Sequence, residues 1–360
     1  MGQTDTRGGL VAVTPITGTK PAWSPDGKLI AFADQTGPTT GASWRLFVVG
    51  VDGRGRRQVI DIGRDAPRAV SWAPNGNSLA YDAFDTDDGV TSVFTVAVAG
   101  GRPTKITSGW APSWGADNKL LFVDQSTDLR DDRVFVVNAD GTARQQLEPC
   151  FEVDIGGCFD GNPDWSSDGK RILLDSVRGS ASAVWTMDPD GSNRRIITPF
   201  VPAAAYPRWS PDGSKIAYHH FDVAASTPGD VSVMNADGTA SQVVAKNGGF
   251  PDWSPDGKTI VFTRAGVLGE SLYLVDAGGS NERQLTAPAP VAARCVVPKL
   301  AGKTLAAATA LLKKANCKTG KVTRVKSKKV KRGAVVSSKP KAGTTAAAGT
   351  AVALVVSLGK

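Results

Sequence analysis

Two acidic loops carry the side chains in this sequence that are best suited to holding a metal ion. The first loop contains Asp82, Asp85, Asp87 and Asp88, and the second contains Asp128, Asp131 and Asp132. Carboxylate oxygens suit Ca²⁺, but neither loop has the regular spacing and terminal Glu of a twelve-residue Ca²⁺ loop. Solvated turn acids are therefore the favoured interpretation of both loops. A Ca²⁺ site in the first loop is the alternative, and no other cofactor is expected.

The signatures of common catalytic sites are missing from the sequence. It has no Gly-x-Ser-x-Gly elbow, no Gly-x-x-x-x-Gly-Lys-Ser/Thr loop and no His-Glu-x-x-His motif. The only two histidines, His219 and His220, are adjacent on a strand-like run, so their rings point to opposite faces. No Cys or second His pair stands at metal-binding spacing, which favours a structural role for both. We name no catalytic residue and expect a protein without enzymatic activity.

The four cysteines are arranged as two local pairs. Cys150 and Cys158 are eight residues apart, and Cys295 and Cys317 bracket a predicted helix. We predict one disulfide within each pair, with four reduced thiols as the alternative. In the chain-entropy treatment, closing the loop between Cys295 and Cys317 stabilises a small domain by about 3 kcal/mol.

A repeated tryptophan must organise the segments that carry these side chains. Trp-Ser-Pro-Asp-Gly or a relative of it occurs six times, with spacings of 49, 42, 51, 44 and 44 residues. The copies begin at Trp23, Trp72, Trp114, Trp165, Trp209 and Trp253. A period in the forties that carries strand-like runs is typical of propeller blades with four antiparallel strands. The fold class predicted for this part of the chain is an all-β, six-bladed propeller.

Each repeat contains the same sequence of strands and turns. The Pro and Gly of the motif favour a tight turn, and a short apolar run such as residues 29–32 follows it. Apolar side chains on both faces of this run predict an inner strand between neighbouring blades. A third strand then ends at an Asp-Gly or Gly-Gly turn, and a more polar fourth strand closes the unit.

These repeats resemble the propeller repeats of the TolB family, which also occur beside hydrolase domains in the prolyl oligopeptidase family. The resemblance covers residues 10–287. We expect residues 10–14 to form an extra strand that pairs beside residues 282–286 of the last blade, because an unpaired edge favours aggregation. The repeated Trp residues are expected to pack between blades, whereas Trp44 and Trp110 are candidates for lining a surface site.

The composition of the chain changes near residue 288. Residues 294–360 contain 16 Lys and Arg and no Asp or Glu, whereas the preceding residues contain 26 basic and 34 acidic residues. An acidic propeller is therefore joined to a strongly basic domain, which suggests different partners for the two. We assign residues 1–9 to a disordered N-terminus and residues 288–293 to a Pro/Ala linker. The basic domain is predicted to contain one helix at residues 304–315 on a three-stranded sheet formed by residues 321–325, 335–338 and 350–357.

The order of these elements, with Val297-Pro298 near the start, Gly302-Lys303-Thr304 before the helix and a final valine-rich strand, resembles a PASTA domain. That family occurs on penicillin-binding proteins and bacterial Ser/Thr kinases, so the resemblance implies association with peptidoglycan. The basic residues of this domain could bind an anionic wall polymer. The candidates are Lys321, Arg324, Lys326, Lys328, Lys329, Lys331 and Arg332. Nucleic-acid binding is the rejected alternative, because no aromatic residue from residue 294 onward could stack on bases.

The sequence therefore predicts a non-enzymatic envelope protein. Its propeller would bind an unidentified protein, peptide or glycan, and its basic domain would associate with peptidoglycan or an anionic wall polymer. The alternative is a glycan lyase or hydrolase that uses loop carboxylates in the central funnel. No apolar run is long enough to span a membrane. Residues 1–9 lack the apolar core of a signal peptide, so we expect either a truncated start of an extracytoplasmic protein or an intracellular chain.

Overall fold

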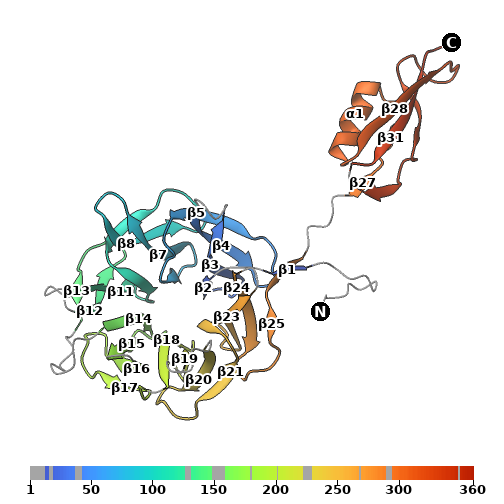
Figure 1. Ribbon diagram of the computed structural model, residues 1–360. Helices are drawn as coiled ribbons and strands as arrows, with labels where there is room; N and C mark the ends of the chain where they lie inside the picture. The colour runs from blue at the N-terminus through green and yellow to red at the C-terminus, as the bar shows by residue number, and fades with distance from the viewer. Residues whose placement is uncertain are drawn as a thin grey trace. The chain divides into compact units, whose positions relative to one another are not determined.

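The computed structural model describes residues 13–15, 19–36, 43–125, 131–147, 159–178, 181–200, 202–221, 229–266, 269–288, 294–347 and 349–360. Residues 14–287 form one compact unit, and residues 288–360 belong to a second. Figure 1 shows both units as ribbons.

The larger unit is built from consecutive sets of four antiparallel strands. The first set is β2 (Thr19–Trp23), β3 (Leu29–Thr36), β4 (Ser43–Gly50) and β5 (Arg57–Gly63). The second is β6 (Val70–Trp72), β7 (Ser78–Asp85), β8 (Val90–Ala97) and β9 (Thr104–Ser108). The third is β10 (Trp110–Trp114), β11 (Lys119–Gln125), β12 (Asp132–Asn138) and β13 (Gln145–Gln146). The fourth is β14 (Phe159–Trp165), β15 (Ile172–Arg178), β16 (Ala181–Met187) and β17 (Arg195–Ile196). The fifth is β18 (Ala203–Trp209), β19 (Lys215–Phe221), β20 (Asp230–Asn235) and β21 (Gln242–Ala245). The sixth is β22 (Gly249–Trp253), β23 (Thr259–Gly266), β24 (Gly269–Asp276) and β25 (Arg283–Gln284).

Four of these sets are separate four-stranded sheets. The third and fourth sets are joined into one eight-stranded sheet by a single parallel pair, Asp132 with Phe159. In the third, fourth and sixth sets the polar fourth strand is only two residues long, shorter than predicted. Pairing continues beyond each of these short strands, because the backbone N–H groups of Leu147, Ile197 and Leu285 still donate to the third strand. The result is an all-β, propeller-like fold.

The turn that follows each motif Trp owes its shape to the Ser and Asp side chains. Ser24 Oγ accepts a hydrogen bond from the backbone N–H of Leu29 at 2.9 Å and donates to Asp26 Oδ1 at 2.7 Å. Gly27 has a φ of 70°, a value that glycine adopts without a steric penalty. The same Ser–Asp pair recurs at Ser166–Asp168, Ser210–Asp212 and Ser254–Asp256. Local chemistry therefore fixes the same turn in four of the repeats.

The core of this unit lies between neighbouring sets of strands. The second strands are buried on both faces, as the apolar runs predicted: Ile30, Ala31 and Phe32 are each 0% exposed. Every motif Trp packs against residues of the preceding set, and Trp23 packs against Val261 and Leu272 of the last set. The predicted packing role of these tryptophans is confirmed.

The first strands of all the sets meet around a common axis. Each contacts the first strand of the next set, and β22 contacts β2, so that the chain forms a closed ring. Figure 1 shows this ring with its colours running from blue to orange. The extra strand β1 (Val13–Pro15) pairs with β26 (Thr286–Pro288) in a two-stranded sheet of their own. We predicted that the extra strand pairs beside residues 282–286. Residues 283–285 pair with β24 instead, so the partner of β1 is the segment that begins at Thr286.

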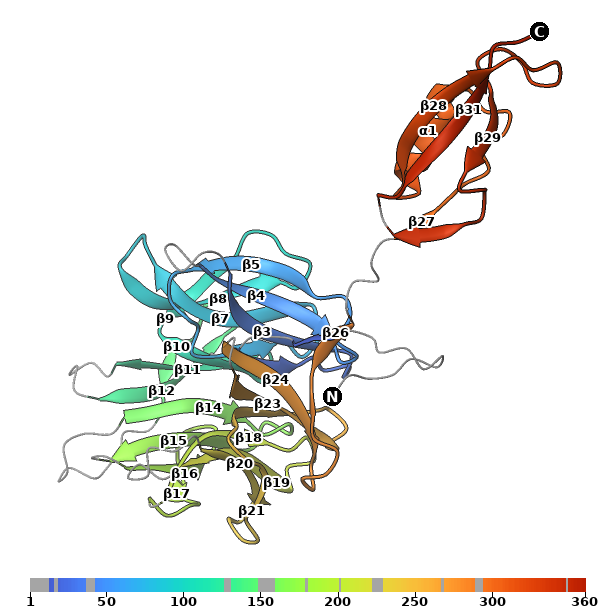
Figure 2. The same ribbon diagram turned by 45° about the vertical axis from the view of Figure 1, so that its right-hand side comes forward.

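The smaller unit consists of one helix and two small sheets (Figure 2). Its elements are β27 (Arg294–Val296), α1 (Leu305–Lys314), β28 (Lys318–Val325), β29 (Val335–Lys339), β30 (Thr345–Ala347) and β31 (Ala351–Ser357). The predicted three-stranded sheet is present, with β31 between β28 and β29, and β27 pairs with β30 in an additional sheet. Thr304 caps the helix by accepting from the backbone N–H of Ala307. Ala308 and Leu312 turn toward a core that contains Leu300, Val352 and Leu354.

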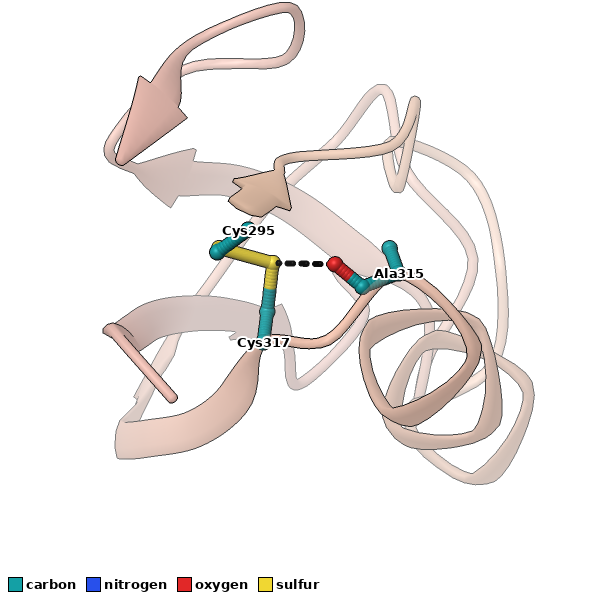
Figure 3. Close-up of a disulfide and its surroundings, with 3 residues drawn as sticks. All are labelled: Cys295, Ala315 and Cys317. Carbon is teal, nitrogen blue, oxygen red and sulfur yellow. Dashed lines mark hydrogen bonds between the residues drawn. A yellow bond between two sulfur atoms is a disulfide. The ribbon is translucent and has the colours of Figure 1, made fainter. Parts of the chain in front are cut away.

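A disulfide links the start of this unit to the end of its helix. Cys295 lies in β27 and Cys317 follows α1, and their Cα atoms are 4.8 Å apart. Figure 3 shows the bond, with Cys317 Sγ 3.4 Å from the carbonyl oxygen of Ala315. The predicted Cys295–Cys317 pair is therefore present. Cys150 and Cys158 lie outside the described residues.

Candidate functional site

A backbone bulge in the first strands shapes the centre of the ring. In five of the six sets, the residue three positions before the motif Trp has a positive φ and precedes a proline. These residues are Lys20, Ala111, Asn162, Tyr206 and Phe250, with φ values of 54°, 52°, 46°, 53° and 53°. The pairing with the second strand shifts register at the same place in each of them. Such bulges redirect side chains, and non-glycine residues at positive φ carry strain that proteins tolerate at functional sites.

The wide part of the central channel is a cavity of about 340 Å³ beside the Trp-containing turns. Three charged side chains line it: Asp164, Arg208 and Asp252. Each stands directly before a motif Trp, in the fourth, fifth and sixth sets. The side chains before Trp in the repeats therefore define the chemistry of this cavity.

Both aspartates connect neighbouring sets of strands. Asp252 accepts a hydrogen bond from the backbone N–H of Trp23 at 2.7 Å, and Asp164 accepts from that of Trp209 at 2.9 Å. In the second set, Ser71 Oγ accepts from the backbone N–H of Trp114 in the same way, at 2.9 Å. Burial raises the pKa of Asp252 to about 7 and also raises the pKa of Asp164, while the Arg208 charge opposes both shifts. The two carboxylates thus fasten successive sets together and titrate above the usual range.

The narrow part of the channel is a cavity of about 10 Å³ that shares Pro21, Val70 and Arg208 with the wide part. It is lined by Lys20, Arg68, Tyr206, Arg208 and Phe250, together with small residues and prolines. The Lys20 ammonium lies 3.4 Å from the centre of the Phe250 ring and 4.9 Å from that of Tyr206. Burial lowers the pKa of Lys20 to about 8, although the charges of Glu270 and Asp82 raise it in part.

His219 and Trp110 each contact a residue that lines this narrow end. The His219 ring stacks against Tyr206 with centroids 6.1 Å apart, and burial lowers its pKa to about 4. The Arg68 guanidinium lies 4.4 Å from the centre of the Trp110 ring, which places Trp110 beside the channel. Trp44, the other candidate, lies in β4 and packs against the core between the first and second sets.

The first acidic loop does not form a common metal site. Asp82 is 2% exposed and accepts hydrogen bonds from the backbone N–H groups of Arg68 at 3.0 Å and Ala69 at 3.1 Å. Burial raises its pKa to about 6. Asp85 and Asp88 instead pair with the Lys105 ammonium, and Asp85 accepts from the backbone N–H of Asp87.

The second acidic loop is described only in part. Asp131 pairs with Arg133, and Asp128 lies outside the described residues. Burial raises the pKa of Asp132. Across the described ranges, no three His, Cys, Asp or Glu side chains are placed to hold a metal ion together.

The predicted polymer-binding cations lie on one strand and the loop that follows it. Lys321 and Arg324 belong to β28, and the other five follow between β28 and β29. All seven are exposed. Ser327 and Ser357 hold the loop, since Ser327 Oγ accepts from the N–H of Val330 and Ser357 Oγ donates to the carbonyl of Val330. The strand and its anchored loop therefore present these cations to solvent.

The three charged residues of the wide cavity were not identified from the sequence. A signal for them was available, because aligning the six repeats on their Trp places Ala22, Ser71, Ser113, Asp164, Arg208 and Asp252 at one position. A proline two residues before Trp marks the same register in all sets but the second.

Comparison with protein families identifies the class to which this fold belongs. The TolB beta propeller domain matches residues 30–292, and the PASTA domain matches residues 296–358. The chain therefore belongs to the TolB beta-propeller family and carries a PASTA domain after the propeller.

Solved structures with the same fold include proteins of different kinds. TolB from Acinetobacter baumannii superposes with a TM-score of 0.60 at 18% identity, over 73% of this chain and 66% of that one. An oligogalacturonate lyase in complex with manganese has a TM-score of 0.50 at 16% identity, over 77% of this chain and 95% of that one. The beta-propeller domain of the Trilobed protease from Pyrococcus furiosus has a TM-score of 0.51 at 14% identity, over 78% and 98%. At these identities the likeness shows the fold alone.

The helix content is small in both units. Among the residues described, no helix has the length and apolar character that crossing a bilayer requires; α1 has ten residues.

Proposed function

We propose that this chain is a non-enzymatic, extracytoplasmic binding protein of the cell envelope. Its propeller, with the six sets of strands as six blades, offers its channel to a protein, peptide or glycan partner. Its PASTA domain holds it to peptidoglycan or to an anionic wall polymer. The union of a TolB-type propeller with a PASTA domain supports an envelope location.

The observation that carries the wall-binding part is the charge of the PASTA domain. It has 16 basic residues and no Asp or Glu, and the seven cations of β28 and its loop are exposed. None of them can be neutralised by an acidic side chain of its own domain. A surface of this kind attracts phosphates and carboxylates at a distance of up to a Debye length, about 8 Å at physiological salt.

Cosedimentation with purified cell walls tests this assignment. The triple variant Lys326→Gln, Lys328→Gln, Lys329→Gln should bind walls at least tenfold more weakly than the unaltered chain, and the salt dependence of binding should become shallower. A matched control replaces three exposed lysines of the propeller turns, Lys28, Lys170 and Lys258, whose side chains are 79%, 81% and 82% exposed. Equal binding by both triple variants would refute the assignment, as would tighter binding of duplex DNA than of wall polymer.

The alternative, a propeller enzyme, draws on one specific observation. Asp164 and Asp252 are two carboxylates with raised pKa values that line the same cavity, and such pairs occur in glycan-cleaving enzymes. However, each carboxylate accepts a backbone N–H of the following set, and Arg208 lies close enough to oppose both shifts. These contacts account for both residues as structural elements. Release of soluble fragments from peptidoglycan or polygalacturonate by the full chain, lost in Asp164→Asn, would favour the enzyme instead.

A further inference from the structure

The narrow part of the channel contains three cations that lack a carboxylate partner. Lys20, Arg68 and Arg208 all line it, and none of them forms an ion pair with any residue in the described part of the chain. The Arg208 guanidinium donates only to the carbonyl of Pro207, and Arg68 stacks on Trp110. Lys20 and Arg208 are half-buried and Arg68 is exposed, and withdrawing a cation from water is costly unless an anion compensates it.

The other propeller guanidinium groups that lie over aromatic rings differ from Arg68 in having a carboxylate partner. Guanidinium groups near the outer strands lie over aromatic rings as Arg68 does, but each also pairs with a carboxylate. The pairs are Arg56–Asp34, Arg144–Asp124 and Arg264–Glu282, each with a shortest N–O distance of 2.6 Å. The unit has an excess of acidic residues, so partners for the channel cations were available in number.

Nearby carboxylates are occupied by main-chain donors instead. Asp82 accepts from the N–H groups of Arg68 and Ala69, and Asp252 accepts from that of Trp23. Asp175, which also feels the Arg208 charge, accepts from the N–H of Tyr206 at 2.7 Å. Asp164 is bonded to the N–H of Trp209, and Glu270 acts on Lys20 only through its charge. These acids reduce the net charge of the channel, but they leave the donors of the three cations available.

Apolar surface lies directly beside those donors. The Tyr206 and Phe250 rings meet edge to face with centroids 4.5 Å apart. The Trp110 ring lies against the Arg68 guanidinium, with its centre 4.4 Å away. Lys20, Tyr206 and Phe250 occupy the strained bulges of three different first strands. The fold thus keeps unfavourable backbone conformations at the places that bring cations and aromatic rings together.

We propose that the narrow end of the channel binds the terminal carboxylate of a peptide. Arg68 and Lys20 would pair with the carboxylate and Arg208 would close the end of the pocket, while Tyr206, Phe250 and Trp110 contact the last side chains. The free volume of this cavity, about 10 Å³, is close to that of one water molecule, so a carboxylate enters only as the flexible Lys20 and Arg68 side chains move aside to pair with it. Charge-assisted pairing of Arg with a carboxylate is directional and strong. This inference rests on the proposed role of the propeller as a binding module.

The test uses the full chain and peptides that differ in one group. A randomised mixture of N-acetylated hexapeptides is passed over immobilised protein, once as free acids and once as C-terminal amides, and bound peptides are identified by mass spectrometry. The tightest free acid and its amide are then compared by calorimetry. We expect the acid to bind at least tenfold more tightly than the amide.

Two variants and one control connect this difference to the channel. Arg68→Gln and Lys20→Gln should each lower the affinity for the free-acid peptide at least tenfold and leave the affinity for the amide unchanged. Arg54→Gln is the control, because its side chain is 75% exposed outside the channel. Arg68 is itself exposed, so its variant tests the inference even if Lys20→Gln fails to fold.

Equal affinity for acid and amide would overturn the inference, and so would an Arg54→Gln effect as large as that of Arg68→Gln. Tighter binding of polygalacturonate than of any peptide would overturn it as well. Wall cosedimentation measured on the same Arg68→Gln protein separates the two proposals: if walls are still bound but no free-acid preference exists, only the peptide site is refuted.

Discussion

Different kinds of contact stabilise the interior of the propeller and the interior of the PASTA domain. In the propeller, Trp side chains and aspartate–backbone hydrogen bonds join successive sets of strands, and the bond from Trp23 to Asp252 joins residues 229 positions apart. In the PASTA domain, a disulfide links residues only 22 positions apart. Residues 14–287 provide enough interior to close by packing alone, whereas a domain as small as residues 294–360 gains from a covalent link.

The two units also treat their charges differently. Several propeller cations near the outer strands are paired with carboxylates, whereas Lys20, Arg68 and Arg208 of the channel have no such partner among the described residues. The PASTA domain has no acidic side chain and therefore leaves all of its cations to outside partners. Charge is thus partly compensated inside one unit and left uncompensated by acidic side chains in the other.

The largest expected effect comes from removing an aromatic contact between sets of strands. Trp253 is 5% exposed, packs against Ala217 and Val233 of the fifth set and donates to the carbonyl of Arg208. Trp253→Ala should lower the free energy of unfolding of the propeller by about 3–5 kcal/mol. All nine Trp residues precede residue 294, so Trp fluorescence during urea unfolding reports on the propeller alone. Trp44→Ala, at a half-buried site, should cost clearly less; equal losses would contradict the packing role.

The next largest effect is confined to the PASTA domain. Replacing both Cys295 and Cys317 by Ser should destabilise it by about 3 kcal/mol, because the reduced unfolded chain gains freedom. Hydrogen exchange of residues 294–360 should accelerate, while Trp fluorescence unfolding stays the same. The double variant Cys150→Ser, Cys158→Ser is the control and should not change exchange in the PASTA domain. If propeller stability fell together with that of the PASTA domain, the two units would not be independent.

A third effect depends on pH through Asp252. Its folded pKa of about 7 lies above its ordinary value, so the folded state binds a proton that the unfolded state has lost. The Asp252 contribution is therefore most favourable below the ordinary pKa and is lost as pH rises toward 7. Relative to Asp252→Asn, the unaltered chain should lose stability across this range, by at most about 1.4 kcal/mol per pH unit. Urea midpoints at successive pH values measure this difference.

The control for this pH series is Asp256→Asn, at an exposed turn. Hydrogen bonds from the Ser254 hydroxyl and from the backbone N–H of Lys258 hold the pKa of Asp256 below its ordinary value. Its contribution should therefore be present at neutral pH and lost only as the solution becomes more acidic. The same sign for both variants would show that Asp252 is not buried as described.

The smallest expected effect concerns the outer strands. Arg144 pairs with Asp124 and lies 4.4 Å from the centre of the Phe135 ring, with a side chain that is 40% exposed. Arg144→Gln should lower the stability of the propeller by about 0.5–1 kcal/mol, measured from the urea midpoint. Arg54→Gln should have no measurable effect. A loss above 2 kcal/mol at Arg144 would mean that the peripheral ion pairs contribute as much as the contacts between sets.

Features set by local chemistry were predictable from the sequence. The Ser24–Asp26–Gly27 turn, the doubly buried run that contains Ile30 and Phe32, and the helix capped by Thr304 each depend on residues close together in the chain. The Cys295–Cys317 pair was predictable because both residues flank that helix.

Features set by the closed ring were not predictable in the same way. Asp252 and Trp23 meet only after all the intervening sets have formed, so the position of Asp252 before its Trp marks the residue but does not reveal its partner. Arg208 and Lys20 likewise acquire their roles from the common axis. The short strands β27 and β30 were missed because three-residue runs give no clear alternation.

The sequence of the PASTA domain has a consequence for how the protein responds to acidification. Between residues 294 and 360 there is no Asp, Glu, His or Tyr, and both Cys are bonded to each other. Lys and Arg keep their protons throughout the range from about pH 4 to 9. The propeller channel, by contrast, contains groups that change protonation near neutrality. A shift in the acidity of the surroundings would therefore change the charge of the channel while the charge of the PASTA domain stays constant.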